Sequence, residues 1–185
     1  MNARITAGLL KGRVIRVPES ALRFRPTLER ARISIADMIQ PRCAGAICAD
    51  ICAGCGAMGF EMLSRGASRV DFVENDPSCA AIIRDHAEKF AVTSQCRIYT
   101  QSVESFIGSC RESYHVIFYD PPYDATNLAA LIGPLLRLVR SDGILLYQRL
   151  HRGPKTDSAE KKPIQPIDLR RYGISVVEVY RPAKG

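Results

Sequence analysis

Between residues 46 and 148, short apolar runs typical of buried strands alternate with segments of helical periodicity. The runs are of strand length, and the segments between them place apolar residues on one helix face. Strands and helices that alternate in this way pack into a mostly parallel sheet with helices on both faces, so we predict an α/β fold. The predicted strands are 46–51, 69–74, 96–100, 115–120 and 143–148, and the predicted helices are 56–65, one that begins at Pro77, 103–110, and 128–139 with a bend or break at Gly133–Pro134.

Shorter elements are predicted at both ends of this core. Residues 4–17 form two short strands around a Gly/Lys turn, and Thr27 can cap a helix that runs to about Ile39. Near the carboxyl terminus, residues 166–172 and 173–180 are expected to pair as a hairpin. Residues 150–166, polar and rich in Pro and Lys, are expected to form a mobile loop.

The basic charge of the chain is concentrated at its two ends. Residues 1–32 hold eight Lys/Arg and two Asp/Glu, and residues 149–185 hold nine and four, whereas the middle of the chain is acidic. Charge gathered into two segments favours a footprint for a phosphate backbone over lysines scattered for solubility. We therefore divide the chain into a basic amino-terminal extension, 1–41, and a main domain, 42–185.

Composition narrows the class of protein. No apolar run approaches the ~18 residues of a membrane-spanning helix, and the amino terminus lacks the charged and apolar pattern of a signal peptide. The chain has seven cysteines, an odd number that cannot all pair, and it is long enough to bury a core without disulfides. We expect a soluble cytoplasmic protein, monomeric and free of membrane contacts, whose cysteines are reduced.

Two cofactor signatures overlap in the stretch CADICAGCGAMGFE. Cys48, Cys52 and Cys55 have the C-x₃-C-x₂-C spacing of an iron–sulfur loop, while the glycines of the same stretch spell G-x-G-x-x-G. Cys48 and Cys52 bracket a predicted strand, where a rise of ~3.3 Å per residue separates them by ~13 Å. That distance is too great for one cluster, so we predict no metal here.

The glycines fit their context better than the cysteines do. Gly54, Gly56 and Gly59 follow a buried strand and open a helix, where backbone N–H groups can approach a bound cofactor. Glu74 ends the next strand, at the position from which a carboxylate can bind both hydroxyls of a ribose. These features suit a dinucleotide as well as S-adenosylmethionine. Asp50 favours the second, because a carboxylate before the loop repels a pyrophosphate and tolerates a sulfonium and an ammonium.

The sequence HVIFYDPPY places a carboxylate, two prolines and an aromatic ring at the end of another buried strand. Two successive prolines restrict the backbone and donate no hydrogen bond, so the carbonyl of Pro121 is a rigid acceptor beside the carboxylate of Asp120. Two convergent acceptors suit the amine of a nucleobase, and Tyr123 can stack on the base. We predict that Asp120, Pro121, Pro122 and Tyr123 form the catalytic segment.

With these motifs in place, the chain resembles the class I S-adenosylmethionine-dependent methyltransferases, in which (D/N)PP(Y/F/W) marks amino-methyltransferases. It is most similar to the RsmD-type enzymes that methylate a guanine N2 amine of bacterial 16S ribosomal RNA. The similar stretches run in the expected order along almost the whole chain: RITAGLLKGR, RPTLERAR, DICAGCGAMGFEMLSRGA, VDFVENDP, FYDPPY, DGILLYQ and RRYGISVVEVY.

The resemblance implies a Rossmann-like fold with a seven-stranded sheet, S-adenosylmethionine as cofactor, and 16S RNA or the small ribosomal subunit as partner. The implied cofactor site comprises Asp50, Cys52, Ala53, Gly54, Gly56, Gly59, Glu74, Ser102 and Val103. The basic residues expected to grip RNA phosphates are Arg4, Lys11, Arg13, Arg25 and Arg30.

The chain departs from the family pattern at a few positions. Cys52 and Cys55 replace the usual Phe and Ser of the glycine loop, and Gln148 stands where a Glu is usual. Gln101 or Ser102 occupies the place of an acidic residue that contacts the adenine amine. Two alternatives stay open: an amino-methyltransferase acting on DNA adenine N6 or on a protein glutamine, and an RNA-binding assembly factor without activity.

Overall fold

A computed structural model describes residues 2–16, 29–122, 128–151 and 164–183. Tyr123, Arg25, Thr27 and most of the loop after residue 150, for which predictions were made, lie outside these ranges. In the described parts of the chain, no helix combines the length and apolarity needed to cross a bilayer. The division at residue 41 is not tested and stays a prediction.

The core is a seven-stranded sheet, as predicted, in the order β5-β4-β3-β6-β7-β9-β8. Neighbours from β5 to β7 pair in parallel, and β9 pairs antiparallel with both β7 and β8. β3 lies between β4 and β6, so the strand order reverses beside it, and ligands of open α/β sheets bind at such a point. The strands are β3 (Ile47–Ile51), β4 (Arg69–Val73), β5 (Cys96–Tyr99), β6 (Tyr114–Tyr119), β7 (Val139–Leu150), β8 (Asp168–Tyr172) and β9 (Ser175–Tyr180).

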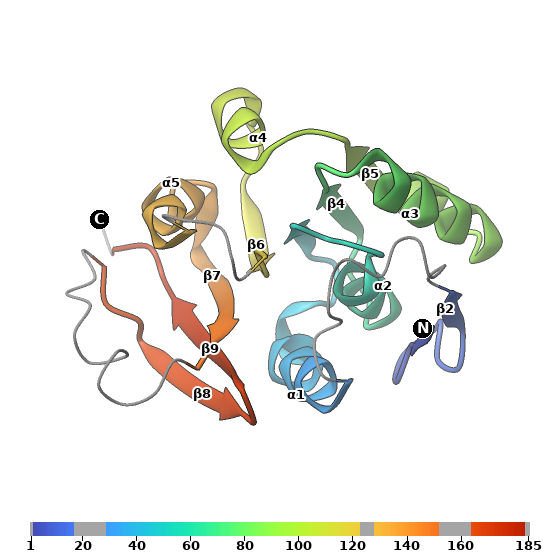
Figure 1. Cartoon of the computed structure of the whole chain (residues 1–185), viewed down its shortest axis with the longest axis horizontal. Helices are drawn as coiled ribbons and strands as arrows, with labels where there is room; N and C mark the ends of the chain where they lie inside the picture. The colour runs from blue at the N-terminus through green and yellow to red at the C-terminus, as the bar shows by residue number, and fades with distance from the viewer. Residues whose placement is uncertain (1, 17–28, 123–127, 152–163, 184–185) are drawn as a thin grey trace.

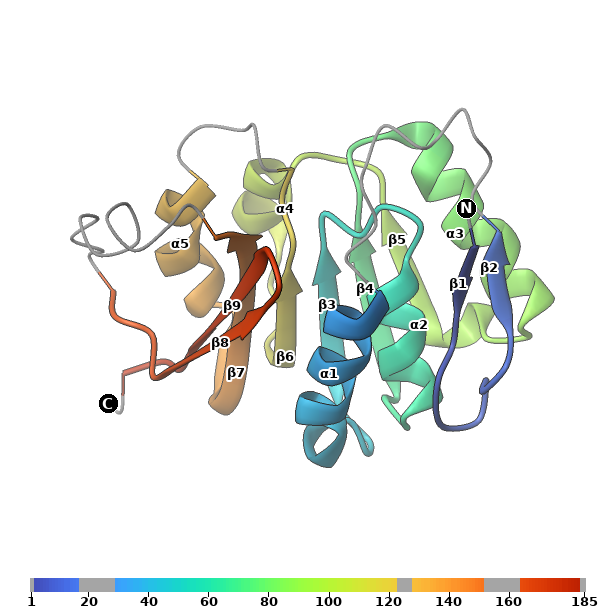
Figure 2. The same ribbon diagram turned by 60° about the horizontal axis from the view of Figure 1, so that its bottom comes forward.

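Helices cover both faces of the sheet (Figures 1 and 2). Apolar residues of α1, α2 and α3 form one buried cluster with one face of the strands, and those of α4 and α5 form a second cluster with the other face. The α-helices are α1 (Glu29–Ile39), α2 (Ala57–Ser64), α3 (Pro77–Lys89), α4 (Val103–Ser109) and α5 (Ile132–Leu136), and the 3₁₀ turns are η2 (Gln40–Arg42), η3 (Thr93–Gln95) and η4 (Leu128–Leu131).

Local signals explain where α3 begins. The side chain of Asp76 accepts hydrogen bonds from the backbone N–H groups of Ser78 (2.7 Å) and Cys79 (3.3 Å). Pro77 occupies the first position of the helix, where a missing N–H costs nothing. Both features were predicted from the sequence and are confirmed.

The predicted helix over 128–139 is wrong in its extent. The chain instead forms the 3₁₀ turn η4, then the five residues of α5, and Val139 already belongs to β7, where it pairs with Tyr114. Pro134 lies in the first turn of α5, where its missing N–H needs no partner. An α-helix that continued from residue 128 through that proline would lose a hydrogen bond, which explains the break.

The amino-terminal hairpin is present but short. β1 (Asn2–Arg4) and β2 (Val14–Arg16) pair antiparallel as a separate two-stranded sheet beside α2 and α3 (Figure 2). Ile5 and Ile15 are fully buried, so the hairpin shares the core of the main domain.

Candidate functional site

The loop between β3 and α2 has an unusual backbone. Cys52, Gly54 and Gly56 all have positive φ angles, 61°, 54° and 79°. Glycine adopts this conformation freely, whereas for Cys52 it costs on the order of 1–3 kcal/mol. The backbone N–H of Ala53 donates to the carbonyl of Val73 (3.1 Å), which ties the strained loop to the end of β4. The loop is therefore held in one shape at the carboxyl edge of the sheet.

Asp50 supports this loop from beneath. Its side chain is only 2% exposed, and Oδ2 accepts a hydrogen bond from the N–H of Gly59 (2.7 Å), in the first turn of α2. Burial raises the pKa of this carboxyl well above its usual range, the Gly59 bond opposes that shift, and the charges of Asp120 and Glu74 add to it. The structure thus gives Asp50 a role in capping α2 that the sequence did not indicate.

Glu74 joins the glycine loop to the segment after β4. Its Oε2 accepts from the N–H of Gly54 (2.7 Å) and its Oε1 from the N–H of Asp76 (2.8 Å). Burial raises the pKa of Glu74, and these backbone donors oppose the shift. A backbone hydrogen bond from Asn75 also lowers the pKa of Glu74, and a carboxylate has about four lone-pair sites, so one remains for a ligand.

The DPPY segment begins beside the same loop. The N–H of Asp120 donates to the carbonyl of Ile51 (3.2 Å), the last residue of β3, and Tyr119 pairs with Ile51 in the sheet. The charge of Asp120 raises the pKa of both Asp50 and Cys52. Pro121 is buried and Pro122 is exposed. Asp50, Glu74 and Asp120 therefore share one edge, and together they favour a cationic ligand.

Ser102 and Val103 follow β5 at this edge. The N–H of Glu74 donates to the carbonyl of Tyr99 (3.0 Å), which brings the ends of β4 and β5 together. The hydroxyl of Ser102 caps α4 by accepting from the N–H of Ser105 (3.2 Å), and Val103 packs against the second core cluster. Ser102 is thus used as a helix cap, which the sequence analysis did not anticipate.

Of the described basic residues predicted to bind RNA, Arg4, Lys11 and Arg13 lie on the hairpin, where Nη1 of Arg4 donates to the carbonyl of Gly12 (3.3 Å), and Arg30 lies on α1. Lys11 lies in the turn of the hairpin, next to Leu10, whose N–H donates to Ser64 at the end of α2 farthest from the glycine loop. Arg13 lies over the ring of Phe90 (5.9 Å), which follows the last residue of α3. Arg4 is exposed on β1, and Arg30 is exposed in the first turn of α1.

The three cysteines with cluster-like spacing do not converge. Cys48 lies within the first core cluster and Cys55 packs against it, whereas Cys52 packs against the second cluster. Burial raises the pKa of Cys48 and Cys52, which disfavours the thiolate that a metal requires. No group of three or more His, Cys, Asp or Glu that could hold a metal ion was found among the described residues.

One hollow among the described residues, of about 270 Å³, lies between β5 and α4. Its lining consists of Arg97, Tyr99, Phe106, Ser109, Cys110, Arg111 and Glu112. None of these residues belongs to the glycine loop or to the DPPY segment. The hollow is therefore not part of the site described above.

Known proteins resemble the chain over most of its length. The family model described as Conserved hypothetical protein 95 matches residues 3–181. "Ribosomal RNA small subunit methyltransferase D" of Escherichia coli (strain K12) is 32% identical over 148 residues, which are 80% of this chain and 71% of that protein. The protein of the same name from Haemophilus influenzae is 34% identical over 125 residues, 66% of this chain and 64% of that protein.

A solved structure agrees with these matches at the level of the fold. The Escherichia coli protein "Putative methyltransferase yhhF" superposes with a TM-score of 0.83 at 22% identity, covering 100% of both chains. The seven-stranded sheet, the hairpin and the order of the helices thus form a known Rossmann-like methyltransferase architecture.

Proposed function

The chain belongs to the RsmD-type family of ribosomal RNA methyltransferases, and on that premise we propose that it methylates the N2 amine of a guanine in 16S ribosomal RNA. Its cofactor is S-adenosylmethionine, which supplies a methyl group bound to a positively charged sulfur. The observation that carries the proposal is the position of Asp120, whose backbone is bonded to the residue that ends β3 and opens the glycine loop.

The residues at the sheet edge fit this cofactor. The backbone of the loop from Cys52 to Gly56 would lie along the cofactor, and the carboxylate of Glu74 would accept from the ribose hydroxyls. The combined negative charge of Asp50, Glu74 and Asp120 would stabilise the sulfonium and the ammonium. A pyrophosphate would meet the same charges unfavourably, which argues against a dinucleotide.

Asp120 and Pro121 would act on the guanine amine. The lone pair of this amine is delocalised into the ring, so the amine is a weak nucleophile. The Asp120 carboxylate and the Pro121 carbonyl would each accept one amine hydrogen, which favours a more sp³-like nitrogen and aligns its lone pair. The cofactor, when bound, would supply the methyl group and leave as the neutral thioether, and the proton that the methylated nitrogen loses would pass to solvent water. No strongly basic residue is required.

Methyl transfer to a set of substrates tests this function. Purified protein is incubated with methyl-labelled S-adenosylmethionine and, in parallel, with 16S RNA, small ribosomal subunits, DNA and protein. We expect label in the RNA or the subunits, recovered as N2-methylguanine after digestion. Label in N6-methyladenine of DNA or in glutamine would support the alternative amino-methyltransferases. RNA binding without any transfer would support the assembly factor.

Glu74→Ala is expected to weaken S-adenosylmethionine binding about 10- to 100-fold, because one charged acceptor for the ribose hydroxyls is lost together with its bond to Gly54. Isothermal titration calorimetry measures the change. The affinity of the wild-type protein for S-adenosylmethionine should also fall on acidification, because protonation removes the negative charge of Glu74. Burial raises the pKa of Glu74, so this fall should begin at a higher pH than for an ordinary glutamate. An unchanged affinity in the variant would contradict the ribose assignment.

A further inference from the structure

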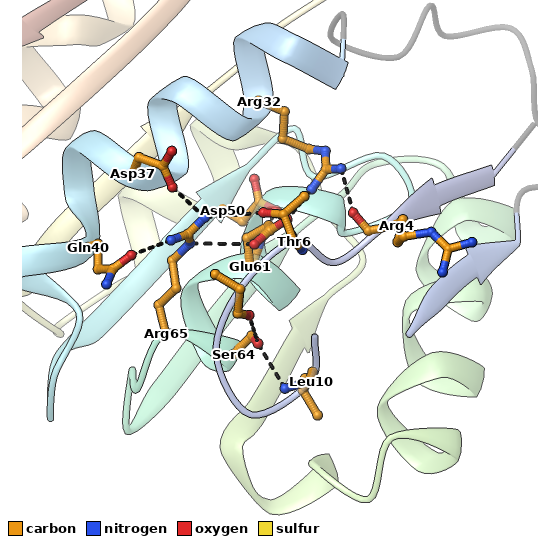
Figure 3. A network of polar contacts seen from close by, with 12 residues as sticks. Arg4, Thr6, Leu10, Arg32, Asp37, Gln40, Asp50, Glu61, Ser64 and Arg65 are labelled. Carbon is orange, nitrogen blue, oxygen red and sulfur yellow. Dashed lines mark hydrogen bonds and ion pairs between the residues drawn. The ribbon is translucent and has the colours of Figure 1, made fainter. Parts of the chain in front are cut away.

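Glu61 is a charged residue inside an otherwise apolar helix. It lies on α2, two residues after Gly59, and its side chain is 0% exposed. Its Oε1 accepts hydrogen bonds from the N–H and the hydroxyl of Thr6, both 2.9 Å, and from Nη1 of Arg32 (2.5 Å). Its Oε2 faces Nε of Arg65 at 3.4 Å (Figure 3). One carboxylate thus joins the hairpin, α1 and α2.

The two arginines extend these contacts in both directions (Figure 3). Arg32 donates through Nη2 to the backbone carbonyl of Arg4 (2.7 Å), which belongs to β1. Arg65 donates to the side chains of Gln40 (2.5 Å) and Thr6 (3.2 Å) and pairs with Asp37 (2.8 Å). Each of these partners lies in the amino-terminal extension, so α2 is bound to it through side chains of both charges.

Contacts between Ser64 and the hairpin turn add a steric constraint. The Ser64 hydroxyl accepts from the N–H of Leu10 (2.8 Å) and donates to the carbonyl of Ala7, while the N–H of Leu9 donates to the Ser64 carbonyl (2.8 Å). A Cβ atom on Gly8 would lie 1.7 Å from that carbonyl oxygen. The hairpin turn can therefore approach α2 this closely only because residue 8 is a glycine.

Such a network is better explained by positioning than by stability. A buried ion pair gains little net stability, because desolvation of both charges offsets their attraction. Removal of one partner, however, leaves a buried charge unpaired, so alternative placements of the hairpin are strongly disfavoured. Glu61 lies on the helix whose first turn is bonded to Asp50 at the sheet edge. The network thus fixes the extension relative to the methyl-transfer centre.

We infer that Glu61, with Arg32 and Thr6, is a positioning residue for the RNA substrate. It holds the basic extension in one orientation relative to the glycine loop, so that RNA bound by the extension presents its target base to Asp120. This inference rests on the proposed function. It predicts that loss of the network impairs the use of RNA and leaves S-adenosylmethionine binding intact.

Glu61→Gln is the direct test, because it removes the charge and keeps the shape. We expect the KM for RNA to rise about tenfold, while the affinity for S-adenosylmethionine stays within about twofold. Hydrogen exchange at the Thr6 and Leu10 amides should accelerate by at least about tenfold, which reports the loosened hairpin without any substrate. An unchanged KM for RNA together with unchanged exchange would overturn the inference, and so would an equal loss of affinity for both substrates.

Thr6→Val decides the matter if Glu61→Gln does not fold. It removes one hydroxyl from the network and leaves the Arg32–Glu61 pair in place, so a rise of about threefold in the KM for RNA is expected. Thr93→Val, the same substitution on the exposed turn η3, serves as the matched control and should leave both substrates unaffected. Equal effects of the two variants would overturn the inference. If the wild-type protein methylates no RNA, the proposed function itself fails, whereas the exchange rates still report whether the network holds the hairpin.

Discussion

Asp120→Ala is expected to lower the turnover number for RNA methylation by about 10²- to 10³-fold or to background. The affinity for S-adenosylmethionine should stay within about tenfold of wild type, because Asp50 and Glu74 still contribute negative charge at the site. The carboxylate that accepts an amine hydrogen is lost, and with it the alignment of the nitrogen. The backbone of residue 120 stays bonded to Ile51, so the glycine loop keeps its support. Single-turnover transfer of labelled methyl measures the first effect, and calorimetry measures the second.

Protein stability separates this effect from unfolding. The charge of Asp120 raises the pKa of the buried Asp50, which means that the two carboxylates repel each other when both are ionised. Removal of Asp120 relieves this repulsion of Asp50, and the melting temperature of the variant, measured in parallel, shows whether it remains folded. Asp142→Ala, on an exposed side chain of β7, is the matched control and should keep full activity. Turnover within about tenfold of wild type in Asp120→Ala would contradict the catalytic role.

The strands and the start of α3 could be predicted because their signals lie within short stretches of sequence. The strands β3, β4, β5 and β6 were predicted to within about two residues at either end, because apolar runs, flanking turn residues and the Asp76–Pro77 cap are local signals. Because parallel strands end at one edge, the same signals also placed Glu74 and Asp120 together. The prediction over 128–139 anticipated a break near Gly133–Pro134 but was wrong in its extent, because apolar spacing does not show that residues 128–131 form a 3₁₀ turn or that Val139 already begins a strand.

The remainder depends on contacts between distant segments. Thr6 and Glu61 are 55 residues apart, and no local pattern connects them. The one available signal was a glutamate within the apolar stretch MGFEML, where a charge requires a buried partner. Likewise, the basic composition of the hairpin predicted RNA contact, but not that Leu9 and Leu10 of its turn bond to the far end of α2. The positive φ of Cys52 was also missed, since cysteine rarely adopts it.

Gly59→Ala is expected to lower the free energy of unfolding by about 1–3 kcal/mol and to weaken S-adenosylmethionine binding. A Cβ atom at this position would lie 2.1 Å from Cε1 of Phe72, a fully buried side chain of β4, so α2 must move away from the sheet. That movement strains the hydrogen bond from the Gly59 N–H to Asp50 and shifts the glycine loop. Urea denaturation measures the stability, and calorimetry measures cofactor affinity.

Gly108→Ala shows whether the expected loss comes from the close approach to Phe72 or from the substitution itself. Gly108 lies within α4, and a Cβ atom there would meet nothing within 4 Å. Alanine has a higher helix propensity than glycine, so this variant should gain about 0.5–1 kcal/mol of stability. The same chemical change is thus expected to act with opposite sign at the two sites. If Gly59→Ala were as stable as Gly108→Ala and bound the cofactor normally, the packing of α2 on β4 could not be what holds the glycine loop in place.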